Sequence, residues 1–410
     1  MSTVRNRTST RLPLAVLCLA AAINLLQSAS LSPLLPSISR EFGTPDAVTG
    51  QLATLGSVVG FGFSLAATPW MDRLSRRTWF RLEGTMIVIG MLLAAFAPSF
   101  LVIALGRILA ASGASLIMAN CMTGAREIFP NPRDRNRAIG FIVSASTLVF
   151  VIGLPAITQI EARFGWRMAF LAIILPTLLL LVGTFALPEI QQAHTERPQG
   201  GALAAFGVAF TNRRVAAFLV VLGLISAIYA GWFVYFGAYV TTVYAVSASV
   251  LSILFLLGGA SQLVANNVAP LLMRRFNPLH ILLGALLALS LALFLSGIVV
   301  VNVPTALAAA VLILNGCGTA YIATNVLLLD SEVSHPGAVM SIAAATGSLG
   351  AALGPFITGV ALASTGSFDA SYRILGLLAP LTVLVVLLGT RRDVNAAVDP
   401  ATTLTSAKRG

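Results

Sequence analysis

Twelve apolar segments, each close to the length that crosses a bilayer, follow one another along this chain of 410 residues. A helix needs about 20 residues to span the hydrocarbon core, and in lipid it must satisfy its own backbone hydrogen bonds. Only 10% of the residues are charged, whereas soluble domains carry about a quarter. The sequence therefore predicts an all-α integral membrane protein with twelve transmembrane helices.

The segments form two groups of six, separated by the one long polar loop. The predicted spans are 12–35, 50–69, 83–97, 100–125, 138–160 and 168–187, followed by 215–239, 247–272, 278–301, 304–329, 338–362 and 372–390. We expect an N-terminal bundle (1–187), a cytoplasmic connector (188–214), a C-terminal bundle (215–392) and a cytoplasmic tail (393–410). The first segment follows arginines as in a signal peptide, but its length predicts an uncleaved span.

The positions of Lys and Arg orient the chain, because basic residues concentrate in cytoplasmic loops and acidic residues contribute little. With both termini inside, only four of the 25 basic residues fall in outside loops: Arg40, Arg163, Arg167 and Arg373. Arg107 lies inside a span, and all the others lie in inside segments. A count of eleven spans would erode this asymmetry. The sequence predicts a multi-pass protein of the cytoplasmic (inner) membrane with both termini cytoplasmic.

The remaining composition excludes several classes of function. The net charge of +11 does not indicate nucleic-acid binding, because the basic residues recur in short loops and do not form one phosphate-binding stretch. Cys18, Cys121 and Cys317 lie in apolar segments without metal-ligand spacing, so we expect no metal and no disulfide. We expect no cofactor, and a monomer whose partners are a small-molecule substrate, the lipid bilayer and, if transport is coupled, protons.

Similar features recur about 200 residues apart, and in the same order, in the two groups of spans. Pro155 in the fifth span corresponds to Pro355 in the eleventh, and Asn120 in the fourth corresponds to Asn325 in the tenth. The basic turn after the second span corresponds to Met273–Arg275 after the eighth. Parallel duplication of this kind occurs in one large class of secondary transporters. It predicts two pseudo-symmetric six-helix bundles.

The charged turn between the second and third spans resembles a motif of a known family, Gly-x-x-x-Asp-Arg-x-Gly-Arg-Arg/Lys. Four residues match it: Asp72, Arg73, Arg76 and Arg77. Thr68 and Ser75 replace its two glycines. Over residues 12–392 the chain resembles the major facilitator superfamily, and most of all its twelve-span drug and sugar efflux members. The resemblance implies alternating access, with this turn as part of the gate.

Other family motifs are partly present. In the fourth span, Arg107 and Gly113 resemble an Arg-x-x-x-Gly-x-Gly pattern. In the fifth, Gly153-Leu154-Pro155 stands where antiporters have Gly-Pro followed by Gly-Gly, and the eleventh carries Gly350, Gly354-Pro355 and Gly359. We expect Pro155, Gly354 and Pro355 to contribute to gating, because proline deletes a backbone donor and kinks a helix.

The resemblance implies that the first, fourth, seventh and tenth spans line a central cavity. The candidate substrate contacts are the polar and aromatic residues of these spans and of the eighth: Asn24, Gln27, Arg107, Tyr229, Trp232, Phe236, Gln262, Asn266 and Asn315. The spacing of the three aromatic residues places them on one helix face. An arginine within a span is costly, so we expect Arg107 to bond to Gln27 at the same depth, either as a structural tie or in substrate or proton handling. Aromatic walls and one cation suit an amphipathic, neutral or anionic solute.

Proton coupling is less clearly encoded. No acidic residue falls near the middle of a predicted span, and the nearest two, Glu83 and Asp330, are placed near cytoplasmic helix ends. Coupling usually needs a buried ionisable group. Either one of these carboxyls carries the proton, or the protein is a facilitator.

We expect a secondary transporter of a drug-like compound or sugar, with export favoured and uptake left open. A polytopic enzyme is disfavoured because the histidines are scattered, and a channel would not explain the duplicated halves. By the family pattern Asp72 lies beside the start of the eleventh span, residues 334–337. We therefore expect Asp72 to close a cytoplasmic latch between the halves.

Overall fold

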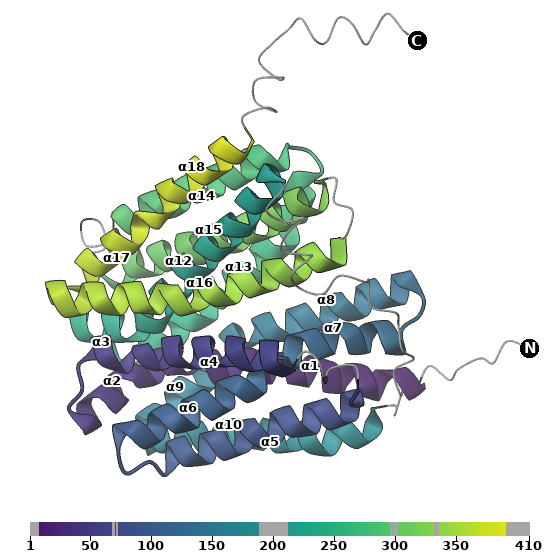
Figure 1. The fold of residues 1–410 in the computed structure, drawn as a ribbon. Coiled ribbons are helices and arrows are strands. Elements are labelled where there is room, and N and C mark those ends of the chain that lie inside the picture. The colour runs from purple at the N-terminus through teal and green to yellow at the C-terminus, as the bar shows by residue number, and fades with distance from the viewer. Residues whose placement is uncertain are drawn as a thin grey trace, which may run out of the picture.

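The computed structural model describes residues 8–67, 70, 73–187, 212–295, 298, 302–331 and 336–390. Within these ranges the chain is helical and contains no strand. Figure 1 shows two groups of helices lying side by side, the purple to blue helices of the first half below and the green to yellow helices of the second half above. The predicted fold class is confirmed, with the two halves as separate bundles.

The N-terminal bundle contains six spans, and five of them are built from more than one helical segment. In order they are α1 (Thr8–Ala29) with α2 (Leu31–Phe42), α3 (Asp46–Thr49) with α4 (Gln51–Ala67), α5 (Arg76–Ala95), α6 (Phe100–Ala114) with α7 (Ile117–Ile128), α8 (Pro132–Leu148) with the π-helix η2 (Val149–Gly153) and α9 (Leu154–Phe164), and α10 (Trp166–Gly183) with η3 (Thr184–Ala186).

The C-terminal bundle contains the other six spans. They are α12 (Arg213–Val243), α13 (Ala248–Met273), α14 (Pro278–Phe294), α15 (Val303–Leu329), α16 (Pro336–Thr365), and α17 (Phe368–Gly376) with α18 (Leu378–Gly389). Eleven spans in the described residues are long and apolar enough to cross a membrane, and α14, with 17 residues, is shorter. Most of the connector, residues 188–211, and the tail after 390 lie outside the described residues.

One predicted boundary was wrong in a way that matters for function. The third span was expected to begin at Glu83, but α5 begins at Arg76, with Ser75 as its N-cap accepting a hydrogen bond from the Thr78 N–H at 3.2 Å. Arginines in the first two turns of α5 lower the mean hydropathy of this stretch. A search for apolar segments therefore places the start of the span several residues after the helix begins. Glu83 is therefore about 10 Å inside the helix, at 1.5 Å per residue.

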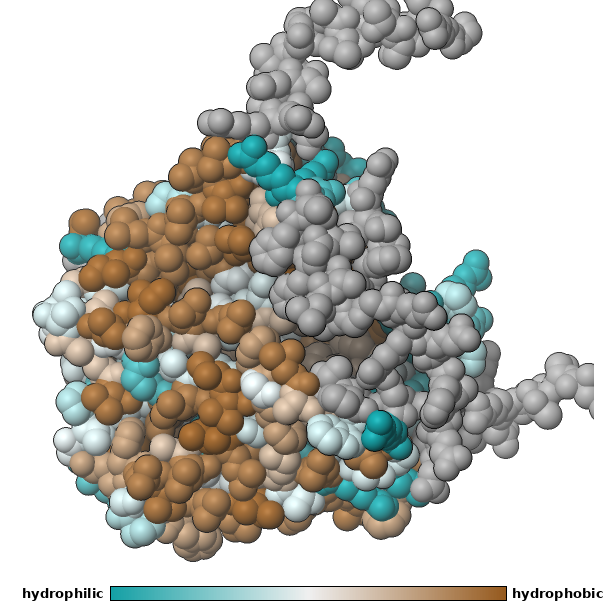
Figure 2. Space-filling view, viewed as in Figure 1, coloured by the Kyte–Doolittle hydropathy of each residue, from teal (hydrophilic) through white to brown (hydrophobic). Residues whose placement is uncertain are grey.

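The surface has the character of a membrane protein. Figure 2 shows large apolar side chains covering most of the visible flank of both bundles. Exposed Leu101, Leu175 and Val182 are typical of this perimeter. In water such a surface would be an aggregation liability, whereas lipid chains solvate it.

The two bundles meet mainly at one end. We call the face at which α1 begins and α18 ends the terminal face, and the opposite one the far face. Contacts between bundles join α12 to α2, α16 to α3 and α4, and α13 to α9, η2 and α8. The hydrogen bonds from Ser32 to Phe233 and from Gln51 to Pro355, which cross between the bundles, lie toward the far face. The basic-residue pattern predicts that the terminal face is cytoplasmic.

Candidate substrate-binding site

A cavity of about 280 Å³ lies between the bundles, on the terminal side of their contact. It is walled by α1, α4 and α6 from one bundle and by α12 and α16 from the other. Of the residues expected to bind substrate, it brings together Asn24, Gln27, Arg107 and Tyr229. Pro355 and Phe233 also line it. The cavity therefore joins both halves of the repeat at one site.

Arg107 contacts Gln27 as expected, but through the backbone. The chain breaks its helix after Ala29, and the last carbonyls of a helix lack partners within it. The Gln27 carbonyl accepts from Arg107 Nη1 at 2.7 Å and from Ser30 Oγ at 2.9 Å. Gln27 Oε1 and Arg107 Nε remain buried without a partner. The site thus holds a cation tied to a helix end, with a free donor and a free acceptor beside it.

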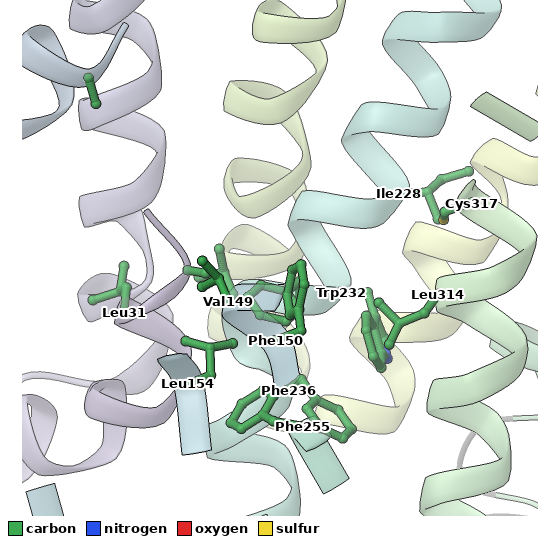
Figure 3. Close-up of a cluster of buried hydrophobic side chains, with 14 of the residues drawn as sticks. Leu31, Val149, Phe150, Leu154, Ile228, Trp232, Phe236, Phe255, Leu314 and Cys317 are labelled. Carbon is green, nitrogen blue, oxygen red and sulfur yellow. The ribbon is translucent and has the colours of Figure 1, made fainter. Parts of the chain in front are cut away.

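The structure places the three predicted aromatic residues in different surroundings. Trp232 and Phe236 are only 3% exposed and do not line the cavity. Their rings contact each other in a tilted arrangement, with 4.7 Å between the ring centroids. Figure 3 shows them packed among Phe255 and Leu314, next to Phe150 of the other bundle. Tyr229 reaches the cavity together with Phe233, whose ring stacks on it at 5.7 Å. The reason is packing, since Phe255 of α13 contacts Phe236 and Leu314 of α15 lies beside Trp232.

This difference gives a test. Tyr229→Ala and Phe233→Ala are expected to weaken substrate binding by about tenfold, because each removes an aromatic surface from the cavity wall. Trp232→Ala is expected instead to lower the thermal stability, since it empties a packed core site and costs about 3–5 kcal/mol. Substrate affinity and melting temperature of the purified variants separate the two effects. A Trp232→Ala protein with normal stability and lost affinity would contradict this placement.

The polar residues of the eighth and tenth spans form a separate cluster inside the C-terminal bundle. Asn315 Nδ2 on α15 donates to Ser261 Oγ on α13 at 3.4 Å. Gln262 and Asn266 lie one turn apart on α13 and approach Gly318 of α15. The carbonyl oxygens of Gln262 and Asn315 are buried and unpartnered. These three predicted contacts therefore do not line the cavity between the bundles.

The two carboxyls considered for proton coupling differ sharply. Asp330 caps the C-terminal end of α15 and is exposed. Glu83, 1% exposed, is the one acidic side chain that is fully buried among the described residues. Its Oε1 accepts from Asn120 Nδ2 at 2.5 Å, and its Oε2 is buried without a partner. The prediction that no acid lies well inside a span is corrected by Glu83, for the boundary error described above.

A polar chain leads from Glu83 toward the terminal face. Arg76 Nη1 donates to Asn120 Oδ1 at 2.8 Å, and Arg76 Nε lies 3.2 Å from Glu127 Oε1. Asn120 thus stands between the buried carboxyl and an arginine that is paired elsewhere. In the second half, the hydrogen bond found in the described residues for the corresponding Asn325 is local, with Nδ2 donating to the Tyr321 carbonyl at 2.8 Å. Both halves have the asparagine, and in the described residues the hydrogen-bond network of Glu83, Asn120 and Arg76 is found in the first half.

The other gating residues of the charged turn are anchored within the N-terminal bundle. Arg77 donates to the carbonyls of Thr184, Phe185 and Leu187 at the end of the sixth span. Arg73 is exposed and its N–H closes a turn on the Trp70 carbonyl. Asp72 and residues 332–335 lie outside the described residues. The latch expected there therefore stays a prediction.

On the far face, hydrogen bonds between neutral groups close the bundles on each other. Ser32 Oγ of α2 donates to the Phe233 carbonyl at 2.7 Å and accepts from the Gly237 N–H at 3.2 Å. Glycine at 237 is what permits this approach, because an added Cβ would lie 2.7 Å from the Ser32 carbonyl carbon and 3.2 Å from Pro33 Cα. No charge is needed for this closure.

The two prolines of the repeat lie at the same contact. The Pro355 carbonyl accepts from Gln51 Nε2 of the other bundle and from Tyr235 Oη, both at 3.3 Å. The Pro155 carbonyl accepts from Ser252 Oγ of the other bundle at 3.4 Å. Proline explains the π-helix before Pro155, since a missing donor leaves the preceding turn free to widen. Gly354 lies within its own bundle, against the α12 backbone at Ala227.

Several of these residues were missed by reasoning from the sequence. No sequence motif marks these residues, and on a hydropathy scale they resemble other residues of a span. They are Phe233, Tyr235, Gln51 and Ser32. One signal was available for Ser32, since small residues at the ends of the first and seventh spans allow close helix approach. Nothing in the sequence indicated that Tyr235 would reach across to the Ala47 carbonyl, at 3.1 Å.

Comparison with known proteins gives consistent matches. Residues 17–355 match the family model of the Major Facilitator Superfamily. The chain is 26% identical over 262 residues to a probable sugar efflux transporter of Mannheimia succiniciproducens, covering 63% of this chain and 64% of that protein. It is 25% identical over 384 residues to the chloramphenicol resistance protein of Streptomyces lividans, covering 91% of this chain and 95% of that protein.

The first curated relatives are matched over part of their length, and the solved structures are matched at low sequence identity. The matched stretches span 42% to 64% of the length of the first four curated relatives. Among solved structures, the nucleoside transporter NupG superposes with a TM-score of 0.73 at 15% identity, covering 93% of this chain and 98% of that one. At this identity the likeness is one of fold.

Proposed function

Because the chain belongs to the major facilitator superfamily of transporters, we propose that it exports an amphipathic, neutral or anionic solute across the cytoplasmic membrane by alternating access. The observation that carries this proposal is the cavity between the bundles, which lies on the terminal side of the hydrogen bonds that join them at the far face. A drug-like compound or a sugar is the substrate class we favour. The named activities of the sugar efflux and chloramphenicol resistance relatives support this class.

The lining of the cavity supports the same range of solutes. Tyr229 and Phe233 provide an aromatic wall, the serines of α1, α4 and α6 provide hydroxyls, and Arg107 provides one positive charge. Among the described residues, none that lines the cavity is acidic. A polycation would therefore find no counter-charge there, while a planar or amphipathic solute finds both apolar and polar contacts.

Counterflow in proteoliposomes tests the proposal. Purified protein is reconstituted, and the uptake of labelled chloramphenicol or a labelled sugar is measured against a saturating internal pool of the same compound. A carrier is expected to show saturable, transient overshoot that a channel cannot produce. Absence of counterflow across a panel of drugs and sugars, with strongly cationic dyes as the best substrates, would contradict the proposed class.

We propose further that export is coupled to protons through Glu83, with Asn120, Arg76 and Glu127 leading toward the terminal face. The carboxyl has one oxygen free of hydrogen bonds, so it can take up and release a proton while keeping its bond to Asn120. The alternative is a facilitator that moves its solute without protons. One observation favours this alternative, since Glu83 is not among the residues that line the cavity. Transport that is indifferent to an imposed pH gradient would decide for the facilitator.

The cytoplasmic latch gives a prediction of its own. Asp72→Asn is expected to slow net transport by about tenfold or more while leaving insertion and folded yield unchanged, because it would remove the charge-assisted bond that the latch hypothesis requires. Transport rate and yield are measured together, with Asp330→Asn as a control at the same face. Normal transport by the Asp72 variant would remove the latch.

A further inference from the structure

We infer that the Arg107 end of the cavity is an anion-binding subsite, which takes a single negative charge carried by the solute or by a free inorganic anion. This inference rests on the proposed role of the cavity as the substrate site. Arginine stays protonated in proteins, so the cavity holds a permanent positive charge.

Arg107 is built into the cavity wall, and one of its donors has no hydrogen-bond partner. The side chain is 4% exposed and lines the cavity. Its Nη1 donates to the neutral Gln27 carbonyl, and its Cζ lies 5.9 Å from the centroid of the Phe170 ring. Its Nε is buried without a hydrogen-bond partner. A guanidinium that is nine-tenths buried and keeps an unused donor can bind a further acceptor.

The described residues supply no counter-charge. The ion pairs found in the described ranges join Arg76 to Glu127 and Arg167 to Glu41, and the cavity lining contains no carboxylate. The buried Glu83 packs against α6 at Gly113, six residues or about 9 Å along the helix from Arg107, and its carboxyl is bonded to Asn120. Burying an unpaired charge is costly, and an anion in the cavity would offset that cost.

The opposite wall suggests what such an anion would carry. Tyr229 and Phe233 stack with an interplanar angle of 7° and both line the cavity. An aromatic or amphipathic monoanion can place its charge at Arg107 and its apolar body against these rings. A halide could fill the charge subsite alone.

Benzoate and benzamide test the inference, because they match in size and shape and differ by one charge. Binding to the purified full-length protein is measured by calorimetry. Benzoate is expected to bind the wild type more tightly than benzamide, and Arg107→Gln is expected to weaken benzoate about 10- to 100-fold while leaving benzamide unchanged. Arg163→Gln, an exposed arginine, serves as the matched control and is expected to change neither.

Exchange of chloride for gluconate separates the two sources of the charge. If chloride competes with benzoate, a free inorganic anion can occupy the subsite; if it does not, the charge must belong to the solute, and either result supports the subsite. Equal binding of benzoate and benzamide by the wild type would overturn it, even if Arg107→Gln fails to fold. Benzoate binding without counterflow would remove the proposed export and keep the subsite, and counterflow without anion preference would do the reverse.

Discussion

Replacing Glu83 with glutamine is expected to abolish uphill export while leaving exchange intact. A pH difference of one unit stores about 1.4 kcal/mol and can hold a concentration ratio of about tenfold. Glutamine keeps an acceptor for Asn120 Nδ2 and has nearly the shape of glutamate, but it cannot carry a proton. In proteoliposomes with that pH gradient, we expect the wild type to hold a substrate concentration ratio across the membrane of about tenfold, and the Glu83→Gln variant a ratio of about one. Counterflow, which needs no net proton movement, should persist.

The control for this experiment is Asp330→Asn. Asp330 was the second candidate from the sequence, and its exposed position at the end of α15 predicts normal coupling. Folded yield and melting temperature of both variants are measured alongside transport. A Glu83→Gln protein that still accumulates substrate in response to the gradient would rule out this carboxyl as the proton carrier.

The fold could be predicted from the sequence because its strongest signal is physical and local. Length and apolarity of a segment decide whether it crosses lipid, and the few outside arginines decide its direction, so twelve spans in two halves follow without any tertiary information. The same approach failed at Glu83 because a helix can begin among arginines that hydropathy assigns to a loop. Spans are recognised by their apolar residues, whereas a charged residue inside a span is a candidate for function. A method based on hydropathy therefore fails where such a residue lies.

The contacts of a candidate site residue could be predicted from the sequence only where its depth in the membrane was enough to identify the residues next to it. Arg107 and Gln27 lie at equal depth on adjacent spans, and the structure brings them together, although by the carbonyl that the break after Ala29 exposes. Trp232 and Phe233 are adjacent in sequence and equally aromatic, yet only one reaches the cavity. That choice depends on the rotation of α12 between its neighbours, which a single sequence does not encode in any local pattern.

The two faces differ in the groups that hold the described helices together. The terminal face carries the charged turn and the arginines that tie α5 to α7 and to the end of α10. The far face is closed by hydroxyl, amide and carbonyl groups around Ser32, Gln51 and Ser252. Neutral hydrogen bonds of this kind contribute about 1 kcal/mol each, so the far face depends on close packing more than on any single bond.

Gly237→Val is therefore expected to hold the far face open and to stop transport. The added side chain would overlap the Ser32 backbone, and overpacking of this kind costs about 1–3 kcal/mol in the closed arrangement only. Since each 1.4 kcal/mol is a factor of about ten, the equilibrium constant for closing the far face should fall by about 5- to 140-fold. Opening can be measured as labelling of a Ser28→Cys cavity residue by an impermeant maleimide, in a background with Cys18 replaced by serine.

Gly62→Val is the matched control, because Gly62 lies in α4 with no atom within 4 Å of an added Cβ. It carries the same helix-propensity change and the same added volume, and it should transport and label like the parent. A Gly237→Val protein with normal folded yield, faster labelling from the far side and little transport would show that glycine is needed there for closure. Normal transport by that variant would mean that the contact between α2 and α12 yields easily, and that closure of the far face depends on the Gln51 and Ser252 contacts instead.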